Sequence, residues 1–217
     1  MGPPGGLNVL FGRSVSEAQS HENGRAGYQT QGRPISRNSR NSARTTIDSR
    51  MRTALDLPAD KLDEHEQEFV AQIREHGWHS TSVVDDDEGP GFTYTTGFWV
   101  NLGMPELILF ALSAEVAHDI LWEVYREAKG GRQFPTGVRV SDIFANVDSV
   151  LVPVGKQHYA EHLGWSRWFY SGDDFPCVQL VWPDKQGRFP WQAGIEESFK
   201  RLQPDITAAG WTKALSQ

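Results

Sequence analysis

The sequence contains one cysteine, Cys177, so no disulfide can form within the chain. Proteins without disulfides are typical of reducing compartments, which favours a cytoplasmic location. No run of about 18 consecutive apolar residues occurs, which is the length that a helix needs to cross a bilayer. The N-terminus also lacks the apolar core of a secretory signal peptide. These absences predict a protein without a membrane partner.

Basic residues are few beyond the N-terminal quarter of the chain. Residues 58–217 carry 13 basic and 24 acidic residues, a balance of −11, whereas residues 1–57 carry eight arginines and four acidic residues, a balance of +4. Because proteins bind nucleic-acid phosphates with basic faces, we expect the folded domain to bind no nucleic acid. The stretch "RPISRNSRNSAR" (33–44) has three interpretations: a basic arm that contacts nucleic acid, a kinase substrate, or a solvated leader.

Apolar runs are absent from residues 1–57, which are rich in Arg, Ser, Gly, Asn and Gln and show no helical or strand period. This composition predicts a disordered leader over residues 1–57. The aromatic-rich residues 58–195 are predicted to form a single compact domain, and residues 196–217 a polar, partly helical C-terminal tail. A start of translation at Met51 is an alternative explanation of the leader.

Two long helices are predicted from apolar side chains at helical spacing. The first covers residues 58–76, and Gly77 offers it a left-handed cap. Its apolar stripe consists of Leu62, Phe69, Val70 and Ile73. The second follows the capping residue Ser113 and ends at Gly130. A shorter helix is expected at the start of residues 156–170.

Strands are predicted where short apolar or alternating runs are bounded by turn residues. They cover residues 78–84, 92–99, 105–112, 147–154 and 178–182, with residues 134–140 interpreted as a short strand or an extended loop. The run 105–112 is almost wholly apolar, which predicts a central strand covered on both faces. Because helices and strands do not alternate regularly, the predicted fold class is α+β, with a mixed or antiparallel sheet of about five strands covered by helices.

The segment "HYAEH" (158–162) fits the H-x-x-E-H pattern of zinc peptidases, in which two histidines bind zinc and the glutamate activates water. His158 and His162 are four residues apart and would share one helical face, with Glu161 on the same side. A third protein ligand is usual for catalytic zinc, and the available side chains are Glu106, His118 and Asp184. Because the pattern specifies only three positions, a chance occurrence is the alternative.

Aromatic side chains concentrate in "GWSRWFYSGDDFP" (164–176). Large rings beside an arginine can line a pocket for a small molecule or a partner protein, and plain core packing is the alternative. Glu106 opens the most apolar strand, where a carboxylate must be paired, protonated or used. The residues predicted to form an aromatic ligand-binding pocket are Tyr94, Glu106, His158, Trp165, Arg167, Tyr170 and Trp182.

The stretch "CVQLVWPDKQGRFPW" (177–191) joins an apolar strand to a turn that contains two prolines. We expect Trp182 to pack in the core and Asp184 to close the turn by accepting hydrogen bonds from the amides of residues 186 and 187. Gln179, a polar residue within the apolar strand, has no predicted role. The sequence leaves open whether this turn is a binding site or a structural corner.

Four segments, "GFTYTTGFW", "PELILFAL", "HYAEHLGWSRWFY" and "CVQLVWPDKQGRFPW", together resemble the bacterial family known as domain of unknown function 4262. The resemblance runs from about Leu62 to Trp191. It implies a bacterial protein with a single compact α+β domain. It implies no activity, so no catalytic residue is carried over.

Two hypotheses of function therefore stand side by side. In the first, the domain binds a small molecule or a partner protein in the aromatic pocket, with Glu106 and His158 as polar groups. In the second, the protein is a metal-dependent hydrolase that binds zinc with His158 and His162 and uses Glu161 as the base. Zinc is expected as a cofactor only under the second hypothesis.

Overall fold

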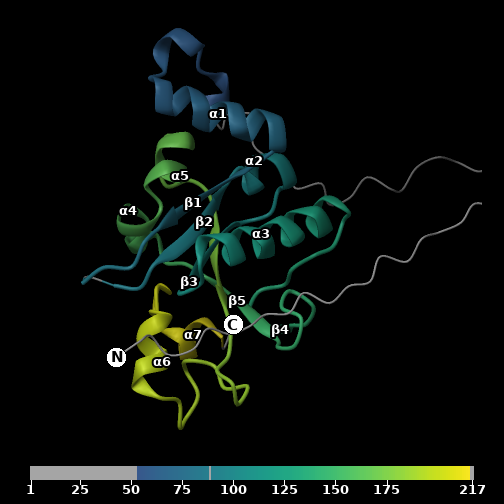
Figure 1. Ribbon diagram of the computed structural model, residues 1–217, viewed down its shortest axis with the longest axis vertical. Helices are drawn as coiled ribbons and strands as arrows, with labels where there is room; N and C mark the ends of the chain where they lie inside the picture. The colour runs from purple at the N-terminus through teal and green to yellow at the C-terminus, as the bar shows by residue number, and fades with distance from the viewer. Residues whose placement is uncertain (1–52, 88, 216–217) are drawn as a thin grey trace, which may run out of the picture. The chain divides into compact units, whose positions relative to one another are not determined.

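Six strands form one mixed sheet in the computed structural model, which describes residues 53–87 and 89–215 (Figure 1). The strand order is β1-β2-β3-β6-β5-β4. The strands are β1 His79–Val83, β2 Phe92–Thr96, β3 Glu106–Phe110, β4 Arg139–Val140, β5 Ser149–Pro153 and β6 Cys177–Val181. Neighbours are antiparallel except for the parallel pair of β3 and β6. The predicted α+β class, the mixed sheet and the central position of β3 are confirmed.

Helices connect the strands and cover the sheet. They are α1 Glu64–His76, α2 Phe98–Leu102, α3 Ala114–Lys129, α4 Tyr159–His162, α5 Gly164–Phe169, α6 Glu197–Leu202 and α7 Trp211–Ala214. Three short 3₁₀ helices accompany them, η1 Ala54–Asp56, η2 Ala59–Lys61 and η3 Lys156–His158. Within residues 53–87 and 89–215, no helix combines the length and the apolar character needed to cross a membrane.

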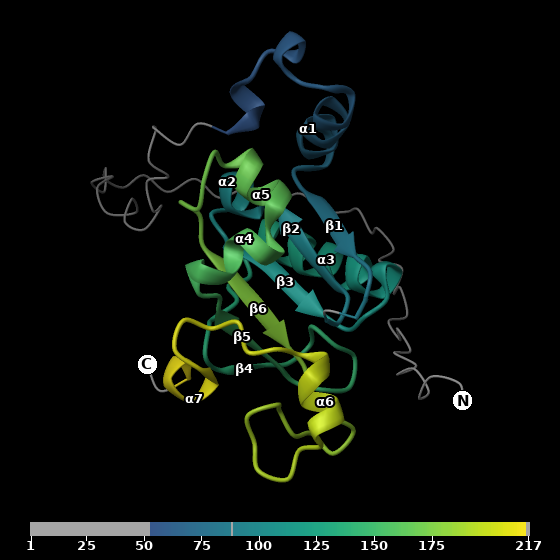
Figure 2. The same cartoon turned by 90° about the vertical axis from the view of Figure 1, so that its left-hand side faces the viewer.

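The two faces of the sheet pack against different helices. On one face Leu107 and Leu109 of β3 meet Ile120 of α3. On the other face Tyr94 of β2 and Ile108 of β3 lie against α1, α4 and α5. Figure 2 shows α4 and α5 in front of the strands and α3 behind them. Alternating side chains of one strand thus enter two separate cores, which explains why β3 is almost wholly apolar.

Helix α1 begins later than its sequence pattern predicts. Asp63 accepts a hydrogen bond from the Glu66 amide, and the Glu66 side chain accepts one from the Asp63 amide, both at 2.9 Å. This reciprocal pair is a capping box, which fixes the first turn at Glu64. The expected helical start at residue 58 is therefore wrong, because residues 59–61 form the separate turn η2. The predicted cap at Gly77 is confirmed by its left-handed φ of 87°.

The strand predicted over residues 92–99 is shorter than expected, because β2 ends at Thr96. Gly97 has a φ of 115°, and the chain then forms α2 from Phe98 onward. A Cβ atom on Gly97 would lie 2.7 Å from the carbonyl oxygen of Gly77. Such a distance is too short for any side chain, so the backbone at Gly97 approaches that of Gly77 closely.

The described parts of the predicted leader and of the predicted C-terminal tail both contact the domain. Most of the predicted leader, including residues 33–44 and Met51, lies outside the described residues. Residues 53–57 fall within the predicted leader, but Ala54–Asp56 form η1, and Ala54 is buried in the core beside α1. Residues 196–215 form α6 and α7, and Ile206 is buried as well. The part of the predicted tail that is described is therefore packed against the domain.

Candidate functional site

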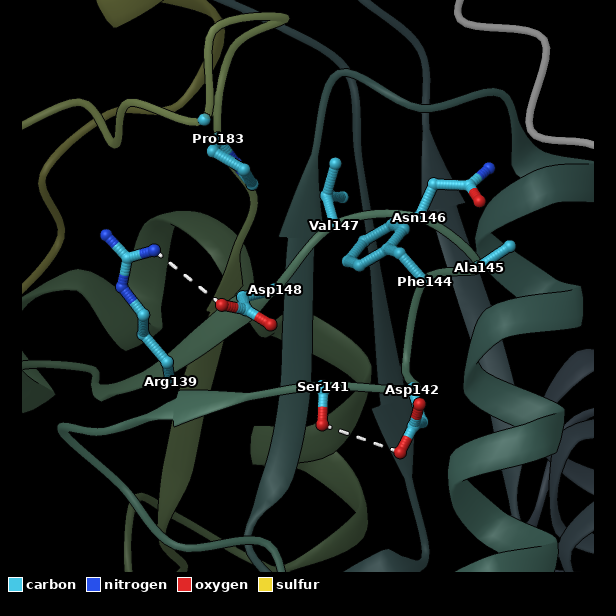
Figure 3. A pocket seen from close by; sticks show the side chains of 10 residues that line it. Arg139, Ser141, Asp142, Phe144, Ala145, Asn146, Val147, Asp148 and Pro183 are labelled. Atoms are coloured by element: carbon cyan, nitrogen blue, oxygen red, sulfur yellow. Dashed lines mark hydrogen bonds and ion pairs between the residues drawn. The ribbon is translucent and has the colours of Figure 1, made fainter.

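The turn after β6 borders two cavities. The first, which we call the loop cavity, has a volume of about 400 Å³ and lies between this turn and the connection from β4 to β5 (Figure 3). Phe144, Val147 and Pro183 give it an apolar wall. Its polar lining consists of Arg139, Ser141, Asp142, Asn146 and Asp148. A concave site with an apolar wall and a few polar groups is the usual form of a small-molecule site.

Asp184 shapes the wall that the turn contributes. One of its carboxylate oxygens accepts hydrogen bonds from the amides of Gln186 and Arg188, at 2.9 and 2.8 Å. The other accepts from Nε of Arg188 at 2.8 Å. Gly187, which has a φ of 77°, donates instead to the backbone oxygen of Asp184. The expected bond to residue 186 is therefore present, and the expected bond to residue 187 goes to the backbone rather than the side chain.

The charge of Asp184 is stabilised by these contacts. Burial raises the pKa of the carboxyl, but hydrogen bonds from the backbone and side chain of Arg188 and from the amide of Gln186 lower it overall. The side chain of Asp184 is 8 % exposed and that of Arg188 is 35 % exposed. The turn is therefore held by an ionised, hydrogen-bonded pair that also fixes Pro183 and Gly187 at the cavity.

The charged groups of the loop cavity remain weakly paired. Nη1 of Arg139 lies 3.6 Å from a carboxylate oxygen of Asp148. The Ser141 hydroxyl reaches the Asp142 carboxylate only at 3.5 Å. The guanidinium of Arg139 also lies 5.1 Å from the ring centre of Phe189, which restricts its orientation. These groups thus keep hydrogen-bonding capacity that a ligand can use.

The second cavity, of about 580 Å³, lies beside α7, and Trp191 and Trp211 are among the residues that line it. Its polar groups are already engaged. The Asp205 carboxylate accepts from the Thr207 hydroxyl at 2.6 Å and from the Trp211 amide at 2.7 Å. Both side-chain atoms of Gln203 bond to the backbone of Trp182. This cavity therefore offers fewer free polar groups to a ligand than the loop cavity does.

Four residues of the predicted aromatic pocket come together on the face of the sheet that carries α1 and α5. The Tyr94 hydroxyl accepts a hydrogen bond from the amide of Trp165 at 3.2 Å. Trp165 stacks on Phe69 with ring centres 4.8 Å apart. The hydroxyl of Tyr170 donates to Glu106 at 2.5 Å. Tyr94, Trp165 and Tyr170 belong to the packed core on this face, and Glu106 is buried beside them.

Glu106 is fully buried and serves as the polar centre of this group. One carboxylate oxygen accepts from the amides of Gly97 and Trp99 at 2.9 and 3.0 Å and from Tyr170, and the other accepts from the Thr95 hydroxyl at 2.6 Å. Burial raises the pKa of Glu106, and these four donors counteract part of that rise. Of the alternatives left open for this carboxylate, the structure shows one with four hydrogen-bond donors around it.

The other three predicted pocket residues lie elsewhere. Trp182 packs on the α3 face of the sheet, where its indole nitrogen donates to the Phe110 oxygen at 3.3 Å. Arg167 forms a half-exposed ion pair with Asp173 at 2.5 Å. His158 lies at the end of η3, stacked beside His162 with ring centres 6.4 Å apart. Neither cavity described above is lined by any of the seven residues.

The "HYAEH" segment spans the junction of η3 and α4. One candidate ligand atom from each of His158, Glu161 and His162 lies within 4.8 Å of the other two. The third ligands considered from the sequence do not join them. Glu106 is engaged as described, Asp184 pairs with Arg188, and Nδ1 of His118 lies 2.9 Å from the Ser80 hydroxyl.

The cavity residues between β4 and β5 were not predicted from the sequence. Polar residues of an irregular connection show no period, so nothing in "SDIFANVD" separated them from an ordinary loop. The nearest signal was the turn with two prolines, which contributes Pro183 and Gly187 to the cavity lining. Gln179, which had no predicted role, donates from its side-chain nitrogen to the Pro204 oxygen at 3.1 Å and so binds the C-terminal segment to β6.

Comparison with known proteins places these observations in one family. A family model described as "Domain of unknown function (DUF4262)" matches residues 72–196. The match covers the end of α1, the whole sheet and the turn that borders the loop cavity. No curated protein and no solved structure matches the chain.

Proposed function

Because the chain belongs to the family described as Domain of unknown function (DUF4262), whose description names no activity, we propose a function from the geometry of the domain. The domain binds a small zwitterionic molecule, of the size of an amino acid, in the loop cavity. The observation that carries this proposal is the loosely paired set of Arg139, Asp142 and Asp148 around a cavity of about 400 Å³.

The charges of the lining support a ligand that carries both signs. An arginine guanidinium binds a carboxylate through two parallel hydrogen bonds. The carboxylates of Asp142 and Asp148 are acceptors for an ammonium group. Since the lining holds one cation and two anions, a simple anion would face a net negative site, and a ligand with an ammonium group is favoured.

The support around the cavity favours a site that is formed before the ligand arrives. Asp184 and Arg188 hold the turn that contributes Pro183 and Gly187. On the opposite side Phe144 is buried in the α3 core, which anchors the loop. A rigid site loses little conformational entropy on binding, so a small ligand can be held by a few contacts.

The proposal keeps the first hypothesis derived from the sequence, a ligand-binding domain, but moves the ligand from the aromatic pocket to the loop cavity. The aromatic pocket remains a prediction. Entry of a ligand there would require Trp165 to leave its stacked position on Phe69. The loop cavity needs no such rearrangement, and for this reason we favour it as the ligand site.

The test is a binding experiment with the twenty amino acids, in which backbone amide resonances are followed by NMR. We expect saturable shifts in residues 139–148 with at least one amino acid. Acetate and methylammonium, which each carry half of the charge pattern, should bind at least tenfold more weakly. Shifts that occur equally with the half-ligands, or only outside residues 139–148 and 183–187, would contradict the proposal.

Two variants sharpen this test. Asp142→Asn removes a charge and preserves the left-handed backbone, which has a φ of 71° at this residue and which Asn tolerates well. Arg139→Gln removes the cation. Both should weaken binding tenfold or more. Asp174→Asn, at a fully exposed residue that does not line the cavity, is the matched control and should bind like the unchanged protein.

A further inference from the structure

The two histidines of "HYAEH" lie close together, outside the loop cavity. His158 ends η3, and Glu161 and His162 lie on the single turn α4. The segment brings two imidazoles and one carboxylate to the same side of the chain. Their candidate ligand atoms lie within 4.8 Å of one another. Among the residues that the structure describes, this group has the composition and spacing of a metal site.

His162 is held firmly in place. Its ring meets Phe92 of β2 and Phe110 of β3 edge to face, with ring centres 5.1 and 5.6 Å apart. Its side chain is only 11 % exposed. One ligand of the group is therefore positioned in advance by the sheet.

One polar atom of the group has no partner within the described part of the protein. Nδ1 of His162 is buried and has no hydrogen-bond partner. Nε2 of His162 lies 3.9 Å from the Glu161 carboxylate, which is too far for a hydrogen bond. A histidine that served only packing would be better replaced by an apolar ring, because an unpaired buried nitrogen costs about 1–3 kcal/mol.

We propose that His158, Glu161 and His162 bind one Zn²⁺ ion. Two imidazole nitrogens and one carboxylate oxygen form a ligand set that zinc accepts, with a fourth position left for water. Ligand atoms around a tetrahedral zinc ion lie about 3.4 Å apart, given bond lengths of about 2.0–2.1 Å. Rotation of the half-buried His158 and the exposed Glu161 toward His162 closes the remaining gap.

The proposed ion would not act as in a zinc peptidase. That chemistry uses the glutamate of the pattern as a base, with a third ligand from elsewhere. In this chain Glu161 is itself a ligand, and the side chains considered as third ligands are engaged in other contacts. The ion instead joins η3 to α4 and thereby fixes the path of the chain from β5 to α5. The zinc site is independent of the loop cavity, so either proposal can fail alone.

The test uses the full chain without an affinity tag, after treatment with a chelator. In titration calorimetry we expect one equivalent of Zn²⁺ to bind and no binding of Mg²⁺, which prefers oxygen ligands. His158→Ala and Glu161→Gln should each weaken zinc binding at least tenfold. His76→Ala, which removes another exposed histidine beside a glutamate, is the matched control and should bind zinc like the unchanged protein.

His162 is tested without substitution, because its ring packs against the sheet and a variant could unfold. We expect the ring-proton NMR signals of His162 to shift on addition of one equivalent of Zn²⁺. Far-UV circular dichroism should show that His158→Ala and Glu161→Gln remain folded. Absence of zinc binding by the unchanged protein would overturn the proposal. Equal binding by all variants, or unmoved His162 signals, would assign the zinc to adventitious surface sites and overturn it as well.

Discussion

Glu106 ties the beginning of α2 to the middle of the sheet. Its carboxylate accepts two backbone amides at the start of α2 and two hydroxyl groups, from Thr95 and Tyr170. Free amides at a helix N-terminus favour a negative or strongly accepting group, and Glu106 provides it from a neighbouring strand. Hydrogen bonding from these four donors thus accounts for a buried carboxylate at this position.

Substitution of Glu106 separates the acceptor function from the charge. Glu106→Ala should lower the free energy of unfolding by about 3–5 kcal/mol, because several buried donors lose their acceptor. Glu106→Gln should cost clearly less, since it keeps one oxygen for the amides and Tyr170. Because the pKa of Glu106 is raised in the folded state, its stabilising effect is complete below the unfolded pKa and declines as the pH rises through the folded pKa.

Urea denaturation of the three proteins at pH 4 and pH 8 checks this pH dependence. The penalty of Glu106→Gln should be larger at pH 4 than at pH 8. A penalty that grows with pH would mean that the ionised carboxylate is the stabilising form, contrary to the raised pKa.

Asp184 provides the opposite case. Its pKa is lowered in the folded state, so its charge stabilises the protein above the unfolded pKa, and this contribution is lost as the pH falls through the folded value. Asp184→Asn should therefore cost about 1–2 kcal/mol at pH 7, mainly through the weakened pairing with Arg188. The cost should shrink as the pH is lowered below 4. An equal loss of unfolding free energy at pH 7 and pH 3, measured by chemical denaturation, would show that the charge of Asp184 does not contribute to stability.

At the scale of elements, the passage from β2 to α2 depends on Gly97. The residue combines a φ of 115° with a close backbone approach to Gly77 and Trp78. Because glycine has no side chain, the chain can pass directly from β2 into α2 while its backbone packs against Gly77 and Trp78. The position of the Glu106 acceptor at the start of α2 depends on this turn as well.

Gly97→Ala should therefore be strongly destabilising, by about 2–4 kcal/mol, because a backbone penalty adds to a steric clash. Gly103→Ala is the matched control at the other end of α2. Gly103 also has a positive φ, of 67°, but no atom lies within 4 Å of the position that a Cβ atom would occupy. That variant should lose only about 1 kcal/mol. Similar thermal midpoints for the two variants would show that the clash at Gly97 is relieved by movement of the chain.

Regular elements were predictable from the sequence, and irregular ones were not. The 16 residues of α3 repeat their apolar pattern over several turns, and its cap at Ser113 was correctly predicted. Helix α2 has five residues, too few to show a period, and its apolar Phe98 and Trp99 were assigned to the preceding strand. The loop cavity combines two segments that meet only in the folded chain, so no local pattern could reveal it.

At the scale of the whole molecule, the C-terminal segment completes the packing around β6. Gln203 binds both the amide and the oxygen of Trp182, and the Pro204 oxygen accepts the side chain of Gln179. Gly155 also donates to the Ile206 oxygen at 2.8 Å. The family match ends at residue 196, so these contacts come from residues beyond the matched region.

Removal of residues 197–217 tests how much this segment contributes to the stability of the domain. The truncated protein should unfold at a thermal midpoint at least about 5 °C lower, because the Gln179 side chain and the backbone of Trp182 lose their partners. Gln203→Ala alone should reproduce part of that loss, and Arg201→Ala, at a neighbouring exposed residue, should not. A truncated protein as stable as the full chain would show that the segment is dispensable for folding.

The parallel pair of β3 and β6 also has a consequence for synthesis on the ribosome. Glu106 of β3 is paired with Cys177 of β6, so the centre of the sheet cannot form until the ribosome has synthesised the residues from Glu106 to Cys177. Until β6 has emerged, the β1-β2-β3 meander and the β4-β5 hairpin each present an unpaired edge. Unpaired apolar edges promote association between chains. Nascent chains that stall before Cys177 are thus the form of this protein most in need of a chaperone.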